Sequence, residues 1–393
     1  MAEPWLSIIG LGEDGPAGLT AASRQALQDA EFVFGGRRHL DLVGGAGQNW
    51  PLPFSIDPVL ALRGRRVAVL ASGDPFWFGV GGTFSAVLDP SEWRAFPAPS
   101  TFSLAAARLG WRIEEVICLG LHAAPLTRLR PHLGRGQRIL CLLRDGKAVA
   151  ELASYLVGSG FGPSQVIVLE ALGGSRERRL SFIAEAIDEV EFSSPVCAAI
   201  TVAGARGLPS ANGLDDDLFD HDGQITKRPV RALTLAALAP RAGEVLWDIG
   251  AGSGSVSIEF LLSSPATTSH ALEADLHRAA RAVRNAEAFG LGHRFHLTQT
   301  RAPKGLADLP RPDAVFVGGG ASHDMLTALW PLLPKGTRLV ANAVTLENEA
   351  LFAVWSAQHG GNLLRIELAQ AEPLGSKRGW QPMRPIVQWS VEK

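Results

Sequence analysis

A glycine-rich stretch between two acidic residues has the residue types and spacing of a nucleoside site. The apolar run in the stretch 245–254 breaks into Gly250, Gly252 and Gly254, and Glu273 follows roughly twenty residues later. Glycines in a turn between a strand and a helix let backbone N–H groups approach a ligand, because no Cβ is in the way. A carboxylate at the tip of the next strand can accept hydrogen bonds from both ribose hydroxyls. We therefore predict that this unit binds a nucleoside.

Asp248, just before the glycines, indicates which nucleoside binds. A dinucleotide would bring two phosphates to the turn, and the carboxylate would repel them. S-adenosylmethionine carries an ammonium and a sulfonium, which a nearby carboxylate favours. The Asp-x-Gly-x-Gly-x-Gly spacing resembles motif I of the class I methyltransferases. A dehydrogenase site and a glycine turn with only a structural role are the alternatives.

A second candidate site is predicted in the first half of the chain, from three loops. Two of the loops follow strand-like runs, and the carboxyl ends of strands are where α/β sheets place ligands. The first loop fits Gly-x-Gly-x-x-Gly, but Glu13 and Asp14 within it argue against a dinucleotide. The third loop leads into a helix whose cap is either a serine or the threonine after it. The residues selected from these loops are Gly10, Gly12, Gly73, Asp74, Ser100 and Thr101.

The first half resembles the tetrapyrrole methylase family over about residues 5–200. The motifs that carry the resemblance are Gly10-Leu-Gly12, Gly73-Asp-Pro75, the loop 97–103, Gly120-Leu-His122 and the stretch 166–175. Members of this family methylate corrin and sirohaem precursors with S-adenosylmethionine. The resemblance implies two α/β lobes with the cofactor between them, so the six loop residues become candidate cofactor contacts.

The second half resembles the precorrin decarboxylase/methyltransferase module of the cobalamin pathway. The motifs are Ile225-Thr-Lys-Arg, the stretch 248–254, Glu273, Arg301-Ala-Pro303, and the stretches 316–320 and 342–348. The candidate cofactor contacts in this half are Thr226, Asp248, Gly250, Ala251, Gly252, Ser253, Gly254, Glu273 and Ala302.

The two halves in this order resemble the family of decarboxylating precorrin-6Y C5,15-methyltransferases. The resemblance implies that the chain methylates C5 and C15 of a reduced precorrin-6 and decarboxylates its C12 acetate, giving precorrin-8 in cobalamin biosynthesis. Residues 1–212 are expected to methylate C5, and residues 213–393 to methylate C15 and decarboxylate, with one S-adenosylmethionine per domain. An RNA methyltransferase and a non-catalytic S-adenosylmethionine-binding protein are the alternatives.

The elements that must position the second site follow from hydrophobic periodicity. Strands and helices alternate from residue 224 to residue 391, which predicts a parallel, doubly wound, Rossmann-like sheet. The segments 362–369 and 385–391 are predicted to finish this sheet as an antiparallel pair. The acidic, glycine-rich segment 207–223 has little periodicity and is interpreted as a linker, with the boundary near residue 212.

In the first half, the same reasoning predicts strands over 5–10 and 66–72. An alanine-rich helix is predicted over 20–30, with Thr20 as its cap. The residues 35–39 are interpreted as a turn. These elements deliver the loops of the first site to one edge of a sheet.

A substrate with many carboxylates also requires basic residues near the sites. The candidates are Lys227, Arg228, Arg301, Lys304, Lys377, Arg378 and Arg384 in the second half, and Arg176, Arg178 and Arg179 in the first. Of these, Arg378 is selected as a catalytic residue. His323 and Asp324 follow Gly318-Gly-Gly320 and could exchange protons with the substrate, with a helix cap as the alternative.

The composition, 46% hydrophobic and 19% charged over 393 residues, indicates folded domains, and the net charge of −2 argues against nucleic-acid or membrane-surface binding. Cys118, Cys141 and Cys197 match no metal pattern, so we expect reduced core thiols, no metal site and a cytoplasmic protein. Glu3 and Pro4 do not fit a signal peptide, and no apolar run is long enough to span a bilayer. Related modules associate as tetramers, which implies a homo-oligomer through the C-terminal domain.

Overall fold

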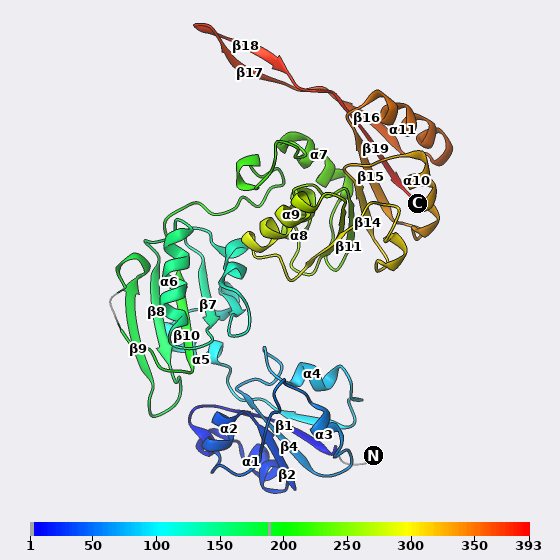
Figure 1. Cartoon of the computed structure of the whole chain (residues 1–393). Coiled ribbons are helices and arrows are strands. Elements are labelled where there is room, and N and C mark those ends of the chain that lie inside the picture. Colours follow the sequence, from blue (N-terminus) through cyan, green and yellow to red (C-terminus); the bar gives the residue numbers. More distant parts are fainter. Residues whose placement is uncertain (1–3, 188–189) are drawn as a thin grey trace. The chain divides into compact units, whose positions relative to one another are not determined.

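The computed structural model describes residues 4–187 and 190–393, which form two compact units (Figure 1). Among the described residues, the first unit contains 4–126, 132–187 and 190–206, and the second contains Thr127–Pro131 and Gly207–Lys393. The division after Arg206 lies a little before the boundary that we predicted near residue 212. Glu3, which we used to argue against a signal peptide, lies outside the described residues. Within the described ranges, no helix is long and apolar enough to cross a membrane.

The first unit contains two five-stranded sheets with helices, which confirms the two α/β lobes that the resemblance implied. The first sheet is parallel, in the order β3 (Gln48–Asn49), β2 (Phe32–Gly35), β4 (Val67–Ser72), β1 (Leu6–Leu11) and β5 (Trp93–Phe96). The second sheet has the order β6 (Ile117–Gly120), β7 (Arg138–Leu142), β10 (Val196–Thr201), β8 (Gln165–Glu170) and β9 (Arg178–Ile183). The helices are α1 (Ala21–Gln28), α2 (Arg37–Leu42), α3 (Asp57–Leu60), α4 (Gly81–Ser85), α5 (Thr101–Leu109) and α6 (Ala148–Gly158).

Hydroxyl side chains cap two helices of this unit. Thr20 caps α1 by accepting a hydrogen bond from the Ser23 N–H at 3.1 Å. Ser100, rather than Thr101, caps α5, because its hydroxyl accepts from the Ser103 N–H at 3.1 Å. The turn predicted over residues 35–39 is wrong, since α2 begins within it at Arg37.

The second unit is built on a seven-stranded sheet, in the order β13, β12, β11, β14, β15, β19 and β16. The strands are β11 (Val245–Ile249), β12 (Thr268–Glu273), β13 (Phe295–Gln299), β14 (Ala314–Val317), β15 (Arg338–Ala343), β16 (Asn362–Ile366) and β19 (Ile386–Glu392). Strands β11 to β15 pair in parallel, and β19 pairs antiparallel with β15 and β16. This confirms the predicted doubly wound sheet that ends in an antiparallel pair.

Helices cover both faces of this sheet, and the strand order reverses beside β11. The helices are α7 (Arg228–Leu238), α8 (Ser255–Leu262), α9 (Leu276–Ala288), α10 (His323–Leu329) and α11 (Leu346–His359). Buried side chains of α10 and α11 pack with Trp247 and Ile249, whereas those of α7 and α8 pack with Leu246. The neighbours of β11 are β12 on one side and β14 on the other, and open α/β sheets bind ligands at the carboxyl end of such a switch point.

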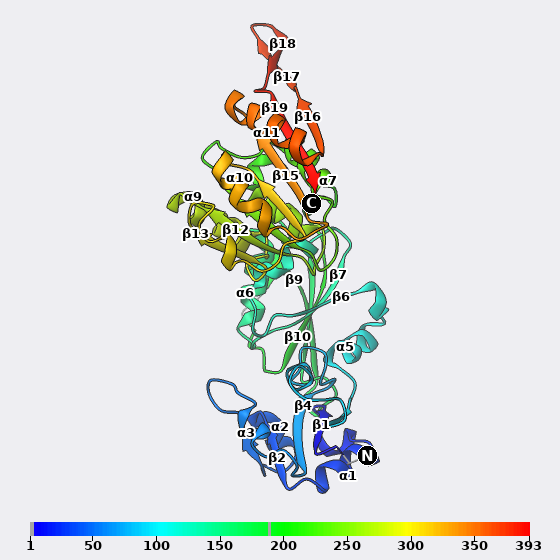
Figure 2. The same ribbon diagram turned by 90° about the vertical axis from the view of Figure 1, so that its right-hand side faces the viewer.

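One feature of this unit was not predicted. The segment 362–369 does not continue as a single strand, because β16 ends at Ile366 and the chain leaves the sheet. It forms an antiparallel hairpin of β17 (Ala369–Leu374) and β18 (Lys377–Pro382) before returning as β19. Figures 1 and 2 show that this hairpin projects away from the seven-stranded sheet.

Candidate functional site

The turn after β11 is built from three glycines with left-handed backbone. Gly250, Gly252 and Gly254 have φ angles of 73°, 59° and 74°, in the region that other residues rarely adopt. A Cβ on Gly250 would also lie 2.7 Å from the carbonyl oxygen of Gly319, in the loop that follows β14. The chain therefore bends sharply from β11 into α8, and at residue 250 only glycine meets both requirements.

The backbone N–H groups of this turn are already hydrogen-bonded within the protein. The N–H groups of Gly250 and Ala251 donate to the Leu272 carbonyl at 2.8 and 3.2 Å, and the Gly254 N–H donates to the Ala251 carbonyl at 2.8 Å. The Gly252 N–H donates to Glu273 Oε2 at 2.8 Å. We expected these donors to face a ligand. Their internal use makes the turn a poor phosphate cradle, which disfavours a dinucleotide.

Glu273, at the end of β12, holds the turn in place. Besides the bond from Gly252, its Oε1 accepts a hydrogen bond from the Asp275 N–H at 2.9 Å. The residue is only 7% exposed. Each carboxylate oxygen has two lone pairs, so each can accept a further hydrogen bond from a ligand hydroxyl. Glu273 therefore has the acceptor capacity for a ribose while it fixes the backbone beside it.

Asp248 is the buried acid of this site. Its Oδ2 accepts a hydrogen bond from Ser257 Oγ at 2.5 Å, whereas its Oδ1 has no hydrogen-bond partner among the described residues. Burial raises the pKa of Asp248 to about 6; the Ser257 bonds lower it, and the negative charge of Glu273 raises it further. A buried carboxylate oxygen without a partner is costly. The site therefore favours a ligand that brings a cation or a donor to Oδ1.

These groups fit S-adenosylmethionine. Asp248 and Glu273 together make the site acidic, which suits a ligand with an ammonium and a sulfonium and opposes a phosphate. The turn also leaves room, since among the described residues, apart from its chain neighbours, the nearest atom to a Cβ placed on Gly252 is the Gln224 carbonyl oxygen at 3.9 Å. Space beside Gly252, together with an unpartnered acidic oxygen, suits the positive charge of this cofactor.

The other predicted contacts of this half lie in several elements. Ser253 is buried, and its Oγ has no hydrogen-bond partner within the described part of the chain. Ala251 packs on the apolar cluster between α8 and α9. Thr226 precedes α7, and its carbonyl accepts a hydrogen bond from Arg231 Nη1 at 2.5 Å. Ala302 is half-buried in the loop after β13. Ser253 and Ala251 thus belong to the turn itself, while Thr226 and Ala302 lie in separate loops.

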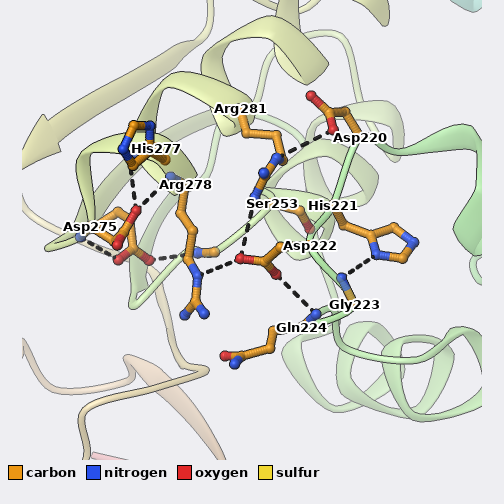
Figure 3. Close-up of polar contacts among 12 residues, drawn as sticks. Asp220, His221, Asp222, Gly223, Gln224, Ser253, Asp275, His277, Arg278 and Arg281 are labelled. Carbon is orange, nitrogen blue, oxygen red and sulfur yellow. Dashed lines mark hydrogen bonds and ion pairs between the residues drawn. The ribbon is translucent and has the colours of Figure 1, made fainter.

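An acidic segment before α7 lies beside the glycine turn, and sequence reasoning missed its role. Figure 3 shows Asp220 and Asp222 facing the arginines of α9. Asp222 lies 2.9 Å from Arg278 Nε and 3.3 Å from Arg281 Nη1. Asn285 then connects this segment to the turn, accepting from the Asp220 N–H and donating to the Ser253 carbonyl, each at 2.9 Å.

The linker interpretation of segment 207–223 is therefore wrong from Gly213 onward. The Gly213 N–H donates to Glu259 Oε2 at 2.6 Å, and the fully buried Arg231 donates to Glu259 Oε1 at 2.5 Å. Phe219 stacks on Phe289 with ring centroids 5.1 Å apart. A single phenylalanine and acidic residues show no periodicity in sequence, so their burial against distant partners was hidden.

The predicted catalytic residues are exposed and lie in two different places. His323 and Asp324 begin α10, and their side chains are 74% and 100% exposed. The helix cap is neither of them but Ser322, whose hydroxyl accepts from the Met325 N–H at 3.2 Å. Both residues follow the loop that adjoins Gly250. Arg378 instead lies on the projecting β17–β18 hairpin, so it does not join the glycine turn of its own domain (Figure 1).

Several predicted carboxylate-binding residues already have acidic partners. Arg228 forms an ion pair with Asp215, and Arg178 forms one with Glu170. Lys227 lies 3.8 Å from Asp216. Exposed positions are occupied by Arg179, Arg301, Lys304, Lys377 and Arg384.

The first unit contains a cavity of about 470 Å³. It is lined by Gly12, Gly73, Ser100 and Thr101, from the three loops that the sequence singled out. The backbone of Gly73 is left-handed, with φ 52°, and a Cβ there would lie 2.8 Å from the Pro99 carbonyl oxygen. The glycine therefore allows the second and third loops to approach each other at the cavity wall.

Gly10 and Asp74 shape these loops from outside the cavity lining. A Cβ on Gly10 would overlap the carbonyl oxygen of Gly73, so glycine is required where β1 meets the next loop. Asp74 Oδ1 accepts a hydrogen bond from the Phe76 N–H at 2.8 Å, which fixes the turn after β4. Their structural roles explain why both residue types occur in these motifs.

A polar cluster in the cavity wall was also missed, because its residues lie in the stretch that we interpreted as a turn. Arg38, on α2, forms an ion pair with Glu13 and donates to Ser72 Oγ at 2.7 Å. His39 Nε2 lies 2.9 Å from the same hydroxyl. Burial, and then the charge of Arg38, lower the pKa of His39 to about 4, so this imidazole is neutral at neutral pH.

A glycine turn at the switch point of a doubly wound sheet, with an acid before it and an acid at the next strand, defines a class I methyltransferase domain. The two-lobed unit with its loop-lined cavity is a second domain. Family models match both: tetrapyrrole (corrin/porphyrin) methylases over residues 6–187 and the precorrin methyltransferase domain over residues 217–393.

Relatives that match over nearly the whole chain share the same name. Precorrin-6Y C(5,15)-methyltransferase (decarboxylating) of Sinorhizobium sp is 48% identical, covering 100% of this chain and 97% of that protein. The protein of the same name from Mycobacterium tuberculosis (strain CDC 1551 / Oshkosh) is 38% identical, covering 98% and 99%. The chain is also similar to a crystal structure of the C-terminal domain of precorrin-6Y C5,15-methyltransferase from Rhodobacter capsulatus. The two sequences are 52% identical, the match covers 47% of this chain and 100% of that chain, and the TM-score is 0.46.

The chain belongs to the family of decarboxylating precorrin-6Y C(5,15)-methyltransferases. It is therefore a methyltransferase, and S-adenosylmethionine is its methyl donor. The RNA methyltransferase and the non-catalytic binding protein that we kept as alternatives are set aside.

Proposed function

We propose that the chain methylates C5 and C15 of a reduced precorrin-6 and removes the carboxyl group of the C12 acetate, giving precorrin-8 in cobalamin biosynthesis. The observation that carries this assignment is the match of relatives with this name over 98–100% of the chain. The activity requires two transfers to different carbons, and the two separate sites described above suit that requirement.

We assign the methylation of C5 to residues 1–212, and that of C15 together with the decarboxylation to residues 213–393. A relative named cobalt-precorrin-6B C(15)-methyltransferase (decarboxylating), from Salmonella typhimurium, is 31% identical, and the match covers 46% of this chain and 96% of that protein. This relative is about as long as one domain of this chain, and its name states only the C15 methylation and the decarboxylation. The acidic glycine turn of the second unit supports placing that half there.

We further propose one S-adenosylmethionine per domain. In the second unit, the contacts would come from Asp248, the turn 250–254 and Glu273, with Thr226 and Ala302 from neighbouring loops. In the first unit, they would come from the residues that line the cavity, namely Gly12, Gly73, Ser100 and Thr101. Gly10 and Asp74 would act by shaping those loops.

The bound cofactor supplies an electrophilic methyl group. The bridging carbons C5 and C15 are flanked by pyrrole-type rings and would be the electron-rich acceptors of this group, and the proton lost from each carbon would require a base. The task of the protein is alignment of the two reactants, and the buried, acidic surroundings of Asp248 hold the cationic end of the donor.

Decarboxylation needs an electron sink, which the substrate provides. The bond from the acetate carbon to its carboxyl group breaks, carbon dioxide leaves, and the electron pair moves to the neighbouring protonated ring imine. A proton then adds to the acetate carbon, leaving a methyl group. We propose that His323 and Asp324, beside the Gly318-Gly-Gly320 loop, exchange these protons, since both side chains are open to a ligand.

We also propose that the chain forms a homo-oligomer, a tetramer through its C-terminal domain. The projecting hairpin supports this, because Leu374 and Trp380 on it are 70% and 77% exposed. Apolar side chains at such exposure are stabilised when another subunit covers them. The catalytic role of Arg378, on the same hairpin, then depends on a site in another subunit.

A cytoplasmic location is likewise a proposal, supported by the cysteines. Cys118, Cys141 and Cys197 form no disulfide. Burial raises the pKa of Cys141 to about 12, so its thiol stays protonated and unreactive. Free, inert thiols suit a reducing compartment.

Labelled methyl transfer tests the assignment of the domains. The full chain is incubated with reduced precorrin-6 and methyl-labelled S-adenosylmethionine, and NMR and mass spectrometry locate the new methyl groups. Gly12→Val adds bulk at the lining of the first cavity, where the nearest atom to a Cβ is Asp14 Oδ1 at 2.6 Å, so this variant should methylate C15 alone and still release carbon dioxide. Glu273→Ala should lower C15 methylation and carbon dioxide release at limiting cofactor and leave the methylation of C5 unchanged. If Gly12→Val lost the C15 methyl group as well, the division between the domains would be wrong.

A further inference from the structure

An exposed aromatic loop borders the cavity of the first unit. Phe76, Trp77 and Phe78 are consecutive and are 45%, 37% and 52% exposed. Trp77 and Phe78 also line the cavity together with Gly12 and Gly73. Adjacent exposed rings at the mouth of a cavity form an apolar surface, which is typical of a ligand-binding site.

The structure holds this loop in one conformation. Phe78 has a left-handed backbone, with φ 55°, which is costly for a residue with a Cβ and is typical of functional sites. The Gly81 N–H donates to the Pro75 carbonyl at 2.8 Å, and a Cβ on Gly79 would lie 2.5 Å from the same oxygen. The Phe78 ring packs over Gly120, where a Cβ would lie 2.9 Å from it.

The ring of Trp77 also packs on a buried aromatic ring. Its centroid lies 5.1 Å from that of Phe102, which is 1% exposed in the core. An exposed tryptophan that rests on a buried ring loses little side-chain freedom when a ligand packs on it, so contact with that ligand is more favourable. The aromatic loop is thus preorganised.

The cavity has the volume of a site for one ligand. Its volume of about 470 Å³ lies in the range that buries a single drug-sized ligand. S-adenosylmethionine is a ligand of that size, whereas a reduced tetrapyrrole is much larger and bears many carboxylate side chains. The macrocycle must therefore extend beyond the mouth of the cavity, where the aromatic loop lies.

A cluster with an excess of positive charge adjoins the cavity. Arg38 and Glu13 line the cavity, and Arg176, which does not line it, lies 3.7 Å from the Glu13 carboxylate that pairs with Arg38. The side chains of Arg38 and Arg176 are 35% and 65% exposed. His39 is neutral at neutral pH. The two arginines and the single carboxylate therefore leave this cluster with one net positive charge. A substrate carboxylate can therefore bind there.

Building on the proposed methylation of C5, we infer that Trp77 and Phe78 are the surface on which a ring of the tetrapyrrole packs. Arg38 and Arg176 bind one of its carboxylate side chains. The two contacts together orient the macrocycle so that its edge, and not its face, enters the cavity. They select the carbon that is methylated.

Kinetics of the full chain test this inference. In Trp77→Ala, the KM for reduced precorrin-6 in C5 methylation should rise about tenfold, the effect of losing one aromatic packing contact. Affinity for S-adenosylmethionine and the methylation of C15 should not change. Trp77→Phe keeps a ring and should restore most of the KM. Phe54→Ala is the matched control, because Phe54 is 52% exposed in the same lobe and does not line the cavity.

A second arm tests the charged contact. Arg176→Ala should raise the same KM severalfold, and added salt should reduce the difference from the unsubstituted chain. Arg179→Ala removes an exposed arginine of β9 that has no ion pair with Glu13 in the described part of the chain, and it should have no effect.

The outcomes separate this inference from the function on which it rests. If the unsubstituted chain transfers no methyl group to C5, the proposed function fails. If it does so and Trp77→Ala has the same KM, the inference alone is overturned. A loss of cofactor affinity in Trp77→Ala would also overturn it, since the loop would then bind the cofactor.

Discussion

Replacing Asp248 by asparagine tests the physical basis of the second site. The substitution keeps the size of the side chain and an oxygen that can accept from Ser257 Oγ, and it removes the charge. In the unsubstituted protein, Oδ1 is buried without a partner among the described residues, so the charge is poorly solvated until a cation binds. We therefore expect the variant to bind S-adenosylmethionine more weakly at neutral pH.

The magnitude follows from the charge and from the pKa. Loss of the charge from a hydrogen bond or ion pair should reduce the binding free energy by about 1–2 kcal/mol, a factor of roughly 5 to 30 in affinity. The pKa of Asp248 is raised from 3.8 to about 6, which corresponds to about 3 kcal/mol of differential stabilisation of the protonated form. The ligand-free folded protein binds the extra proton, so this stability is present at low pH. It is lost as the pH rises from about 3.8 to about 6.

Calorimetric titration over a range of pH measures the effect on binding. The titration is done in the Gly12→Val background, so that only the second site binds. A cation should bind the ionised form of Asp248, so the affinity of the parent should fall as the pH drops below about 6. The affinity of Asp248→Asn should not vary over this range. S-adenosylhomocysteine lacks the sulfonium but keeps the ammonium, so equal losses for both ligands would place Asp248 near the ammonium.

Three results would refute this reasoning. Unchanged affinity in Asp248→Asn would mean that the carboxylate does not face the cofactor. An equally steep pH dependence in the variant would assign the titration to another group. Tighter binding of NAD than of S-adenosylmethionine by the variant would mean that the turn had been misinterpreted.

Further predictions concern the turn, the buried ion pair and the hairpin. Glu273→Ala should weaken cofactor binding at the second site by about 1–3 kcal/mol, measured in the same titration; unchanged affinity would exclude a ribose contact. Arg231→Met leaves Glu259 buried without its charge partner and should destabilise the second unit by about 3–5 kcal/mol in denaturant unfolding. Adding Glu259→Gln should recover part of this loss, and no recovery would contradict the pairing. Trp380→Glu should lower the mass of the assembly in sedimentation, and an unaltered mass would exclude the hairpin from the interface.

Local features that depend on near neighbours in the chain were predictable. Thr20 and Ser100 cap helices because a hydroxyl needs only the N–H three residues later, as at 3.1 Å in both cases. The alternation of strands and helices predicted the parallel sheet, since each buried strand is apolar over its own length. The glycine turn was found because a left-handed backbone selects glycine at the position itself.

What the sequence missed depends on partners far along the chain. The segment after Gly213 is polar and aperiodic, yet it packs because Arg231 neutralises Glu259, 28 residues away, beside the backbone N–H groups of the segment. Arg38 and His39 were interpreted as part of a turn, whereas α2 brings them to Glu13 and Ser72 in the cavity wall.

The amino-acid sequence by itself determined the position of the acidic glycine turn and the class of ligand, because glycines and carboxylates impose backbone geometry and charge wherever they stand. The two domains were predicted from the resemblances of the two halves. Only the tertiary structure decided how those groups are used. It directs the N–H groups of the turn into internal hydrogen bonds, leaves Asp248 Oδ1 without a partner, and sends the hairpin with Arg378 away from its own site. The physical reason is that burial and pairing depend on which residues lie close together in space, and many of those residues are far apart in the chain.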